Sequence, residues 1–314
     1  MIFKNISCLF FVLVLMNCSS TKKQAELLEQ TKPGWLKERP SNDLYYHGIG
    51  IVPKVGSPML YEDKAKNKAL ADISGQINAN IKAEAVMYQV EDKNGVHDYL
   101  QNRIKSTSTE FLEGYEYEDK WEDLSNTYVY YRLSKQVYKE LKAKRKAEAI
   151  EAAKSKYEEG QTQFGNNNFV VAIQQFASCI DLLSGYLNET TFANVEGQQV
   201  DLVAKSGAII ADVLQDIELT SNNADGVEVS CDGHIVANFP IKFEYSGGYL
   251  VNDKIKSNEK GRGALPALPN GTNPSGNTLK AAVDLVSLGR QVTQNLYVRK
   301  IIENQKAAEI LMKL

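Results

Sequence analysis

The sequence predicts an α+β protein of several domains: a small βαβαββ domain, a helical connector and a C-terminal β-sandwich. Three observations lead to this prediction. The length of 314 residues is more than one ordinary domain needs. Apolar residues recur every four positions in several segments before Asp216, and every two positions after it. The composition, 43% hydrophobic and 24% charged, is typical of a globular chain and excludes wholesale disorder.

The N-terminal segment has the layout of a secretory signal. Lys4 supplies a positive charge, and residues 6–16 form an almost unbroken apolar run. Because a helix needs about 20 residues to cross a bilayer, this run is too short to span one and suits the hydrophobic part of a signal peptide. The run ends in Leu15-Met16-Asn17-Cys18, and the polar Ser19-Ser20-Thr21 follow.

This ending resembles the lipobox of bacterial lipoproteins, in which a cysteine directly follows the hydrophobic segment. The resemblance implies a lipoprotein signal peptide over residues 1–17, cleavage after Asn17 and acylation of Cys18. Two or three acyl chains anchor a protein stably to a membrane. By the sorting rule of enterobacterial lipoproteins, Ser19 favours the outer membrane. The alternatives are a plain signal peptide with an incidental cysteine, and a short buried helix in an uncleaved protein.

Residues 18–34 are polar and are interpreted as a lipidated tether, and residues 35–141 as the α+β domain. In that domain a strand is expected over 44–52 and another over 86–91, with a second helix over 96–111. Strands over 113–121 and 127–134 are expected to form a hairpin with a turn at 123–126. A long first helix is predicted from an apolar repeat of four residues: Ala65, Ala69, Ile73, Ile77, Ile81 and Ala85.

Four segments of this region occur in an order that resembles a known family. They are Pro33-Gly34-Trp35, Tyr45-Tyr46-His47-Gly48-Ile49-Gly50, Lys64-Ala65 continuing to Ile77, and Tyr128-Val129-Tyr130-Tyr131-Arg132-Leu133. The series is similar to the Lpp-twenty family of bacterial envelope lipoproteins. The resemblance implies a cell-envelope lipoprotein of non-enzymatic and mostly unknown role, with no catalytic residues to assign.

Residues 142–215 are expected to be helical. Their small and large apolar residues suit a tetratricopeptide-like helix pair with a turn at 165–168. These residues are Gly160, Phe164, Phe169, Ala172, Ile173, Phe176 and Cys179. Because one repeat is visible and a stable array needs about three, a structural helical hairpin is favoured over a peptide-binding groove. A further helix is expected over 200–214.

Residues 216–290 are expected to form a β-sandwich that resembles bacterial immunoglobulin-like modules. Residues 227–231 alternate up to Asp232-Gly233, which predicts a tight hairpin, and further strands are expected over 240–245 and 279–285. Residues 291–314 are expected to close the chain as an amphipathic helix. The remaining cysteines, Cys179 and Cys231, fall in different regions, so two separately buried thiols are favoured over a disulfide.

Candidate chemistry is sparse. The 36 basic and 39 acidic side chains give a net charge of −3, so no basic field is available to hold nucleic acid. His47, His97 and His234 lie in separate settings, which argues against a metal site, and no catalytic or cofactor-binding motif occurs. The basic run 142–146 is interpreted as a solvated helix face, with binding to anionic lipid headgroups as the alternative.

The sequence therefore predicts a non-enzymatic, lipid-anchored cell-envelope protein with a structural, assembly or protein-interaction role at the outer membrane. The expected partners are membrane lipid, through acylated Cys18, and envelope proteins; no cofactor, metal or nucleic acid is expected. The alternative is a peptidoglycan- or glycan-binding module, which would need several aromatic rings on one solvent-facing strip. An enzyme would need a concave pocket with convergent ionisable groups.

Overall fold

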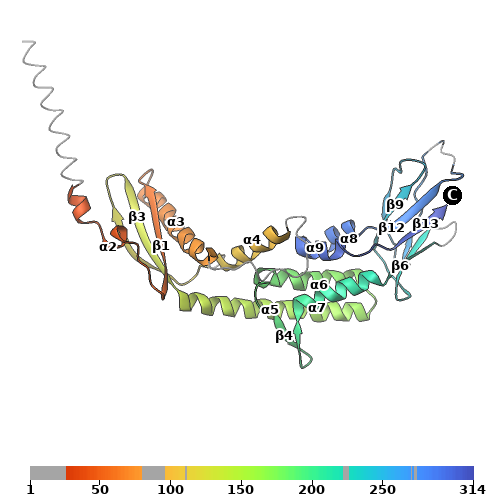
Figure 1. The fold of residues 1–314 in the computed structure, drawn as a ribbon, viewed down its shortest axis with the longest axis horizontal. Coiled ribbons are helices and arrows are strands. Elements are labelled where there is room, and N and C mark those ends of the chain that lie inside the picture. The colour runs from red at the N-terminus through yellow and green to blue at the C-terminus, as the bar shows by residue number, and fades with distance from the viewer. Residues whose placement is uncertain (1–25, 80–95, 110–111, 222–225, 270, 272–273) are drawn as a thin grey trace, which may run out of the picture. The chain divides into compact units, whose positions relative to one another are not determined.

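The computed structural model describes residues 26–79, 96–109, 112–221, 226–269, 271 and 274–314. The protein is mixed α+β with several antiparallel sheets, as predicted (Figure 1). It has two compact units: unit 1 comprises residues 1–81 and 108–143, and unit 2 comprises residues 82–107 and 144–314. Cys18 and the strand predicted over 86–91 lie outside the described residues.

Unit 1 is built on a three-stranded antiparallel sheet with the order β1-β3-β2. Its strands are β1 (Tyr45–Pro53), β2 (Tyr115–Glu122) and β3 (Asn126–Ser134). The short helix α2 (Gly34–Lys37) precedes the sheet, and the long helix α3 (Pro58–Ala79) packs on it (Figure 1). The predicted first strand, long helix and β2–β3 hairpin are therefore confirmed.

Helix α3 packs on the sheet through the predicted apolar stripe. The stripe residues Ala65, Ala69, Ile73 and Ile77 are buried, whereas Ile81 and Ala85 lie outside the described residues. Gly50 of β1 faces the helix backbone: a Cβ atom there would lie 1.8 Å from the carbonyl oxygen of Ala65. Because β1 carries no side chain at this point, the helix lies directly against the strand.

Helix α4 (Val96–Thr109) is present where a second helix was predicted, but its contacts lie in unit 2 rather than in the expected 35–141 domain. The Arg103 Nε atom donates to Ser184 Oγ at 3.0 Å, and Nη2 lies 3.6 Å from Asp181 Oδ1. Thr107 packs against Gly185, where a Cβ atom would lie 2.0 Å from its Oγ1. We expected α4 to belong with α3 because the two helices are adjacent in the sequence, but α4 contacts residues that follow α6.

The helices predicted for the middle of the chain are confirmed as α5 (Lys135–Gly165), α6 (Phe169–Leu183) and α7 (Leu202–Gln215). Helices α5 and α6 meet at Gly160, where a Cβ atom would lie 2.8 Å from Cε1 of Phe176. A short 3-10 helix (Ser184–Tyr186) follows α6.

The sequence did not predict the hairpin that precedes α7. It consists of β4 (Phe192–Val195) and β5 (Gln198–Asp201), joined at Glu196 and Gly197. Both joining residues have positive φ, 49° and 85°. Strands of four residues give too short an alternation to stand out in a sequence.

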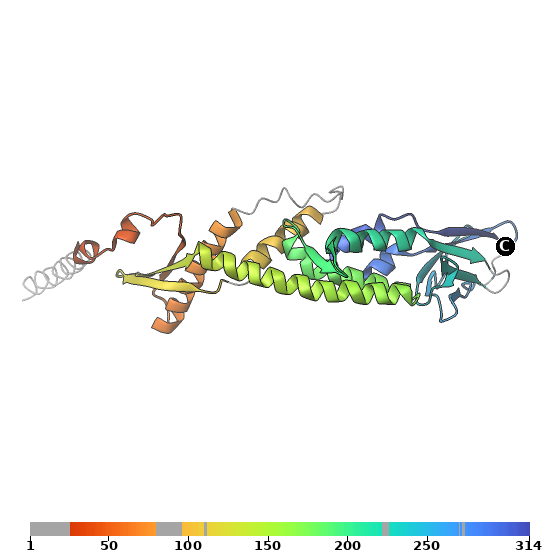
Figure 2. The same cartoon turned by 90° about the horizontal axis from the view of Figure 1, so that it is seen from below.

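The C-terminal region contains two four-stranded antiparallel sheets. One sheet consists of β6 (Ile217–Ser221), β7 (Val227–Cys231), β8 (His234–Ile235) and β11 (Arg262–Gly263). The other consists of β9 (Pro240–Tyr245), β10 (Lys254–Lys256), β12 (Thr278–Val283) and β13 (Glu309–Lys313). Figure 2 shows the C-terminal strand beside β12.

The two sheets meet at Gly263. A Cβ atom there would lie 2.8 Å from Cδ1 of Ile241 in one sheet and 3.4 Å from Cγ2 of Val227 in the other. The predicted tight turn between β7 and β8 is also present, because Asp232 and Gly233 have φ values of 49° and 75°. Positive φ at both central residues is typical of a primed hairpin turn.

The prediction of one amphipathic helix over 291–314 is wrong. Two short helices, α8 (Leu285–Val292) and α9 (Leu296–Glu303), are followed by strand β13, which pairs with β12. The Asn295 side chain accepts bonds from two amides at the start of α9 and thereby separates it from α8. The strand predicted to reach residue 285 ends at Val283, because Asp284 caps α8.

Candidate functional site

The sequence-predicted candidate residues do not converge. Cys18, the predicted lipidation residue, and the side chain of His97 lie outside the described part of the chain. His47 is buried in unit 1, and His234 is exposed beside the β7–β8 turn of unit 2. Among the described residues, no group of three or more His, Cys, Asp or Glu side chains could hold a metal ion.

The two described cysteines are separately buried free thiols, as predicted. Burial raises the pKa of Cys179 to about 11 and that of Cys231 to about 12. Because the thiolate is the nucleophilic form, neither side chain is suited to attack a substrate near neutral pH.

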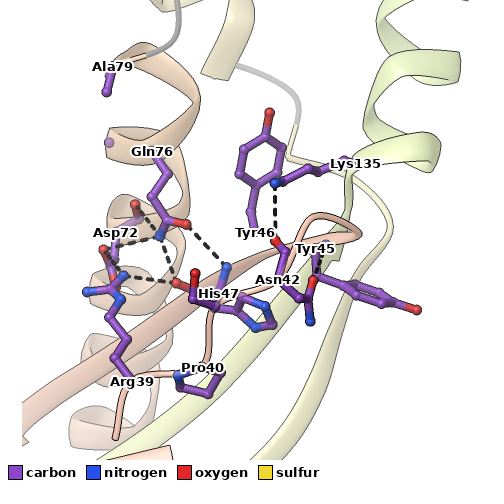
Figure 3. Close-up of a pocket in the computed structure, with 12 residues that line it drawn as sticks. Arg39, Pro40, Asn42, Tyr45, Tyr46, His47, Asp72, Gln76, Ala79 and Lys135 are labelled. Carbon is purple, nitrogen blue, oxygen red and sulfur yellow. Dashed lines mark hydrogen bonds and ion pairs between the residues drawn. The ribbon is translucent and has the colours of Figure 1, made fainter.

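A polar pocket of about 750 Å³ opens along the free edge of β1 in unit 1 (Figure 3). It is called the β1-edge pocket here. Its polar side chains come from the segment after α2, from β1, from one side of α3 and from the start of α5. They include Arg39, Asn42, His47, Asp72, Gln76 and Lys135.

Gln76 of α3 binds the backbone of His47 as a neighbouring strand would. Its Nε2 donates to the His47 carbonyl oxygen at 2.7 Å, and its Oε1 accepts from the His47 amide at 3.3 Å. Both bonds are drawn in Figure 3. Arg39 Nη2 also donates to the same carbonyl oxygen, at 3.0 Å. One residue of the edge strand is therefore saturated by side chains.

Other side chains bond the same edge on either side of His47. Asp72 Oδ2 accepts from the Ile49 amide at 3.0 Å, and Asn42 Oδ1 accepts from the Tyr45 amide at 2.8 Å. Lys68 Nζ donates to the Ile51 carbonyl oxygen at 3.0 Å. Unpaired edge groups are a template for another strand. An incoming strand would have to displace these bonds, so this edge of the sheet is closed.

Asp72 and Arg39 hold one another in place. The Arg39 Nη2 atom lies 2.8 Å and 2.7 Å from the two Asp72 carboxylate oxygens. This pair, together with Gln76, fixes the segment after α2 against α3. Asp72 and Gln76 are spaced four residues apart beside the apolar stripe, and that spacing was the available sequence signal for them.

The His47 imidazole is the group in this pocket whose ordinary pKa lies nearest neutrality. Burial lowers the pKa of His47, and the charges of Lys135, Arg132 and Arg39 lower it further, so the ring is neutral at pH 7. Its Nδ1 lies 2.7 Å from the hydroxyl oxygen of Tyr130. Its Nε2 is buried and has no partner among the described residues.

The polar contacts of this pocket hold the segment after α2 and helix α3 to the β1 backbone. The polar groups of the pocket bond mainly to one another and to the β1 backbone, and the His47 ring contacts a phenol rather than a carboxylate. A general base needs an orienting partner and a nucleophile within reach. The described lining residues do not supply that combination.

Aromatic rings gather on the sheet face opposite α3. Trp35 of α2 lies over Tyr130, with ring centroids 5.5 Å apart, and its Nε1 donates to Asp119 Oδ2 at 2.7 Å. Trp121 and Tyr128 form a second pair at 5.2 Å. These rings are half-buried or buried. Trp35 therefore covers part of the face that a glycan would need.

Most acidic residues of β2 form ion pairs, whereas Asp119 accepts a bond from Trp35. Arg132 lies 2.7 Å from Glu116 and 2.9 Å from Glu118, across the sheet. Within the basic run 142–146, Lys146 lies 2.9 Å from Glu189. Arg132 therefore binds two of the β2 carboxylates, and at least one lysine of the basic run is paired.

No family model matches the chain, and comparisons with curated proteins and with solved structures found no match either. Among the described residues, one stretch, Phe169–Tyr186, is long and apolar enough to cross a membrane. It comprises α6 and the 3-10 helix that follows, and 67% of it is buried within the protein.

Proposed function

We propose that the protein is a lipid-anchored component of the cell envelope, attached to the outer membrane through acylated Cys18, with a structural, assembly or protein-interaction role. The observation that carries this proposal is the apolar run of residues 6–16, which ends at Leu15-Met16-Asn17-Cys18 before a polar segment. The order of motifs that resembles the Lpp-twenty family supports the same role. The proposed role is non-enzymatic and requires no cofactor.

The architecture supports a protein made of interaction modules. We propose that the sheet of unit 1 with α3 forms the Lpp-twenty-like domain, that α5 and α6 form a tetratricopeptide-like connector, and that the two C-terminal sheets form an immunoglobulin-like β-sandwich. Because side chains bond the β1 edge, envelope partners would dock on side-chain surfaces rather than add a strand there.

The anchor is tested by metabolic labelling with palmitate and by the size of the mature chain. Cys18→Ala should abolish both labelling and cleavage, since the acylated sulfur is lost. Cys8→Ala is the matched control: this cysteine lies within the apolar run and would leave with the signal peptide. A Cys18→Ala chain that still matures and sediments with membranes would overturn the proposal.

A glycan-binding module remains the second candidate, and the part of the aromatic face that Trp35 does not cover favours it. Tyr45 lies at the end of a row of rings that continues through His47 to Tyr130. Sugars stack on such rings when they are accessible. Sedimentation of the protein with purified peptidoglycan tests this candidate: Tyr45→Ala should weaken the association, and an absence of sedimentation contradicts it.

A further inference from the structure

Four large apolar side chains are exposed at one end of unit 1. Val55, Met59, Leu60 and Leu124 have exposed fractions of 70%, 77%, 48% and 50%. They come from the loop between β1 and α3, from the first turn of α3 and from the β2–β3 turn. They are called the apolar tip here.

Backbone contacts hold these segments together. The Lys54 amide donates to the Ser125 carbonyl oxygen at 2.8 Å, so the β1–α3 loop lies against the turn that carries Leu124. Gly56 has a φ of 93°, which lets the loop reverse direction toward α3. Figure 1 shows the loop and the turn at the same end of the unit 1 sheet.

Several charges beside the tip are paired, and the Asp123 carboxylate accepts bonds from Tyr128 and from two backbone amides. Lys54 lies 3.5 Å from Glu122, and Lys32 lies 3.1 Å from Glu29. The surface at this end therefore carries an apolar cluster, with two ion pairs and the carboxylate of Asp123 beside it. Clustered exposed apolar side chains of this kind mark a site of contact with a protein or a membrane.

The path of the chain indicates which contact this is. Leu28, Glu29 and Lys32 line a pocket of about 290 Å³ together with Trp121 and residues 123–126. Thr31 Oγ1 accepts a bond from Trp121 Nε1 at 3.4 Å. Figures 1 and 2 both place the helical residues 26–30 near the β2–β3 turn. The chain therefore enters unit 1 at the end that carries the apolar tip.

We infer that the apolar tip rests in the headgroup layer of the membrane to which the protein is anchored. This inference rests on the proposed acylation of Cys18. Residues 18 and 26 are eight positions apart, so the chain between them spans at most about 29 Å. This segment lets the entry end of unit 1 reach the lipid surface and keeps it within that distance. A few apolar side chains at that depth bind the interface between headgroups and acyl chains.

The test uses the mature lipoprotein in vesicles of phosphatidylethanolamine and phosphatidylglycerol. Met59→Cys is labelled with a polarity-sensitive fluorophore, and phospholipids with spin-labelled acyl chains act as quenchers. Cys179 and Cys231 are buried and will not take the label. The matched control is Leu44→Cys, a position that is 70% exposed and lies before the opposite end of β1, about 30 Å away along the strand.

The emission of the fluorophore at position 59 should shift to shorter wavelength and should be quenched by the spin-labelled lipids. The emission of the fluorophore at position 44 should show neither change. Val55→Ser combined with Leu124→Ser should remove the shift at position 59, and Leu44→Ser should leave it unchanged. Equal quenching at both positions, or none in protein that floats with the vesicles, overturns the inference and leaves the anchor standing. Protein that does not float overturns the anchor and the inference together.

Discussion

The Gln76 side chain bonds both the amide and the carbonyl oxygen of His47, at 3.3 Å and 2.7 Å, and so replaces a neighbouring strand at this residue of β1. The replacement couples α3 to the sheet by polar contacts as well as by the buried apolar stripe. Both tryptophans, Trp35 and Trp121, lie in unit 1, so tryptophan fluorescence reports the unfolding of that unit alone.

Gln76→Glu should destabilise unit 1, because a carboxylate has the same shape but cannot donate to the His47 carbonyl oxygen. Arg39 still donates to that oxygen, so the lost bond costs about 0.5–1.5 kcal/mol, and the new carboxylate beside Asp72 adds repulsion. The measurement is the urea midpoint of tryptophan fluorescence. Gln136→Glu, at an exposed position of α5, is the control: it exchanges the bond to Glu140 for a like-charge pair four residues apart and should cost at most about 0.5 kcal/mol. Equal midpoints for the two variants would show that Gln76 does not hold the edge.

Gly50→Ala should destabilise unit 1 by about 3 kcal/mol or more, at the upper end of the range for overpacked cores. The added Cβ atom would lie 1.8 Å from the carbonyl oxygen of Ala65, which belongs to the helix backbone and cannot turn aside. Gly75→Ala in α3 is the matched control, because nothing lies within 4 Å of its Cβ position. It should be neutral or stabilise by up to about 1 kcal/mol, since alanine favours helix. A tolerated Gly50→Ala would mean that α3 and β1 are not in close contact.

Ile77→Ala should lower the free energy of unfolding of unit 1 by about 2–5 kcal/mol, the usual cost of truncating a buried isoleucine. Ile77 is 3% exposed and belongs to a cluster with Ile73 and Leu133. Met59→Ala, at a position 77% exposed, provides the control and should change the midpoint little. An unchanged midpoint for Ile77→Ala would indicate an exposed stripe.

Unit 1 should lose stability as the pH falls from 7 to 5.5. The pKa of His47 is lowered in the folded state, so the unfolded chain, with an ordinary pKa near 6.5, binds more protons in this range. The free energy of unfolding therefore decreases as the pH falls. His47→Gln should flatten this dependence, as seen from urea midpoints at the two pH values. The carboxyl groups of Glu122 and Asp123, whose pKa values are lowered, titrate below this range. The same slope in both proteins would contradict the assignment.

The elements that recur regularly in the sequence were predictable. The stripe from Ala65 to Ile77 predicted α3 and its buried face, and Asp232-Gly233 predicted the β7–β8 turn. The side chains that close β1 were not predicted. Asp72 and Gln76 resemble any polar residues beside an apolar stripe, and their role depends on Arg39 and on a strand more than twenty residues away. Contacts between distant segments leave no periodic signal.

The structure of the C-terminal segment was also not predictable from its local sequence pattern. Residues 291–314 have apolar residues that fit a helical repeat, and local pattern favoured one helix. Two features prevent a single helix. Asn295 caps a new helix, and residues 309–313 pair with β12. The pairing partner lies about thirty positions earlier in the chain, between Thr278 and Ala282, so strand formation there depends on tertiary contacts that override local propensity.

The closed edge of β1 limits how copies of this protein can associate through the unit 1 sheet. A sheet with two open edges can add strands on both sides and grow without end, as fibrils do. Here further strands can be added only beyond β2, where the register already shifts between Tyr117 and Asp119. Two copies joined in that way would have no edge left for a third. Association through this sheet therefore ends at a pair, and any larger assembly must grow through other surfaces.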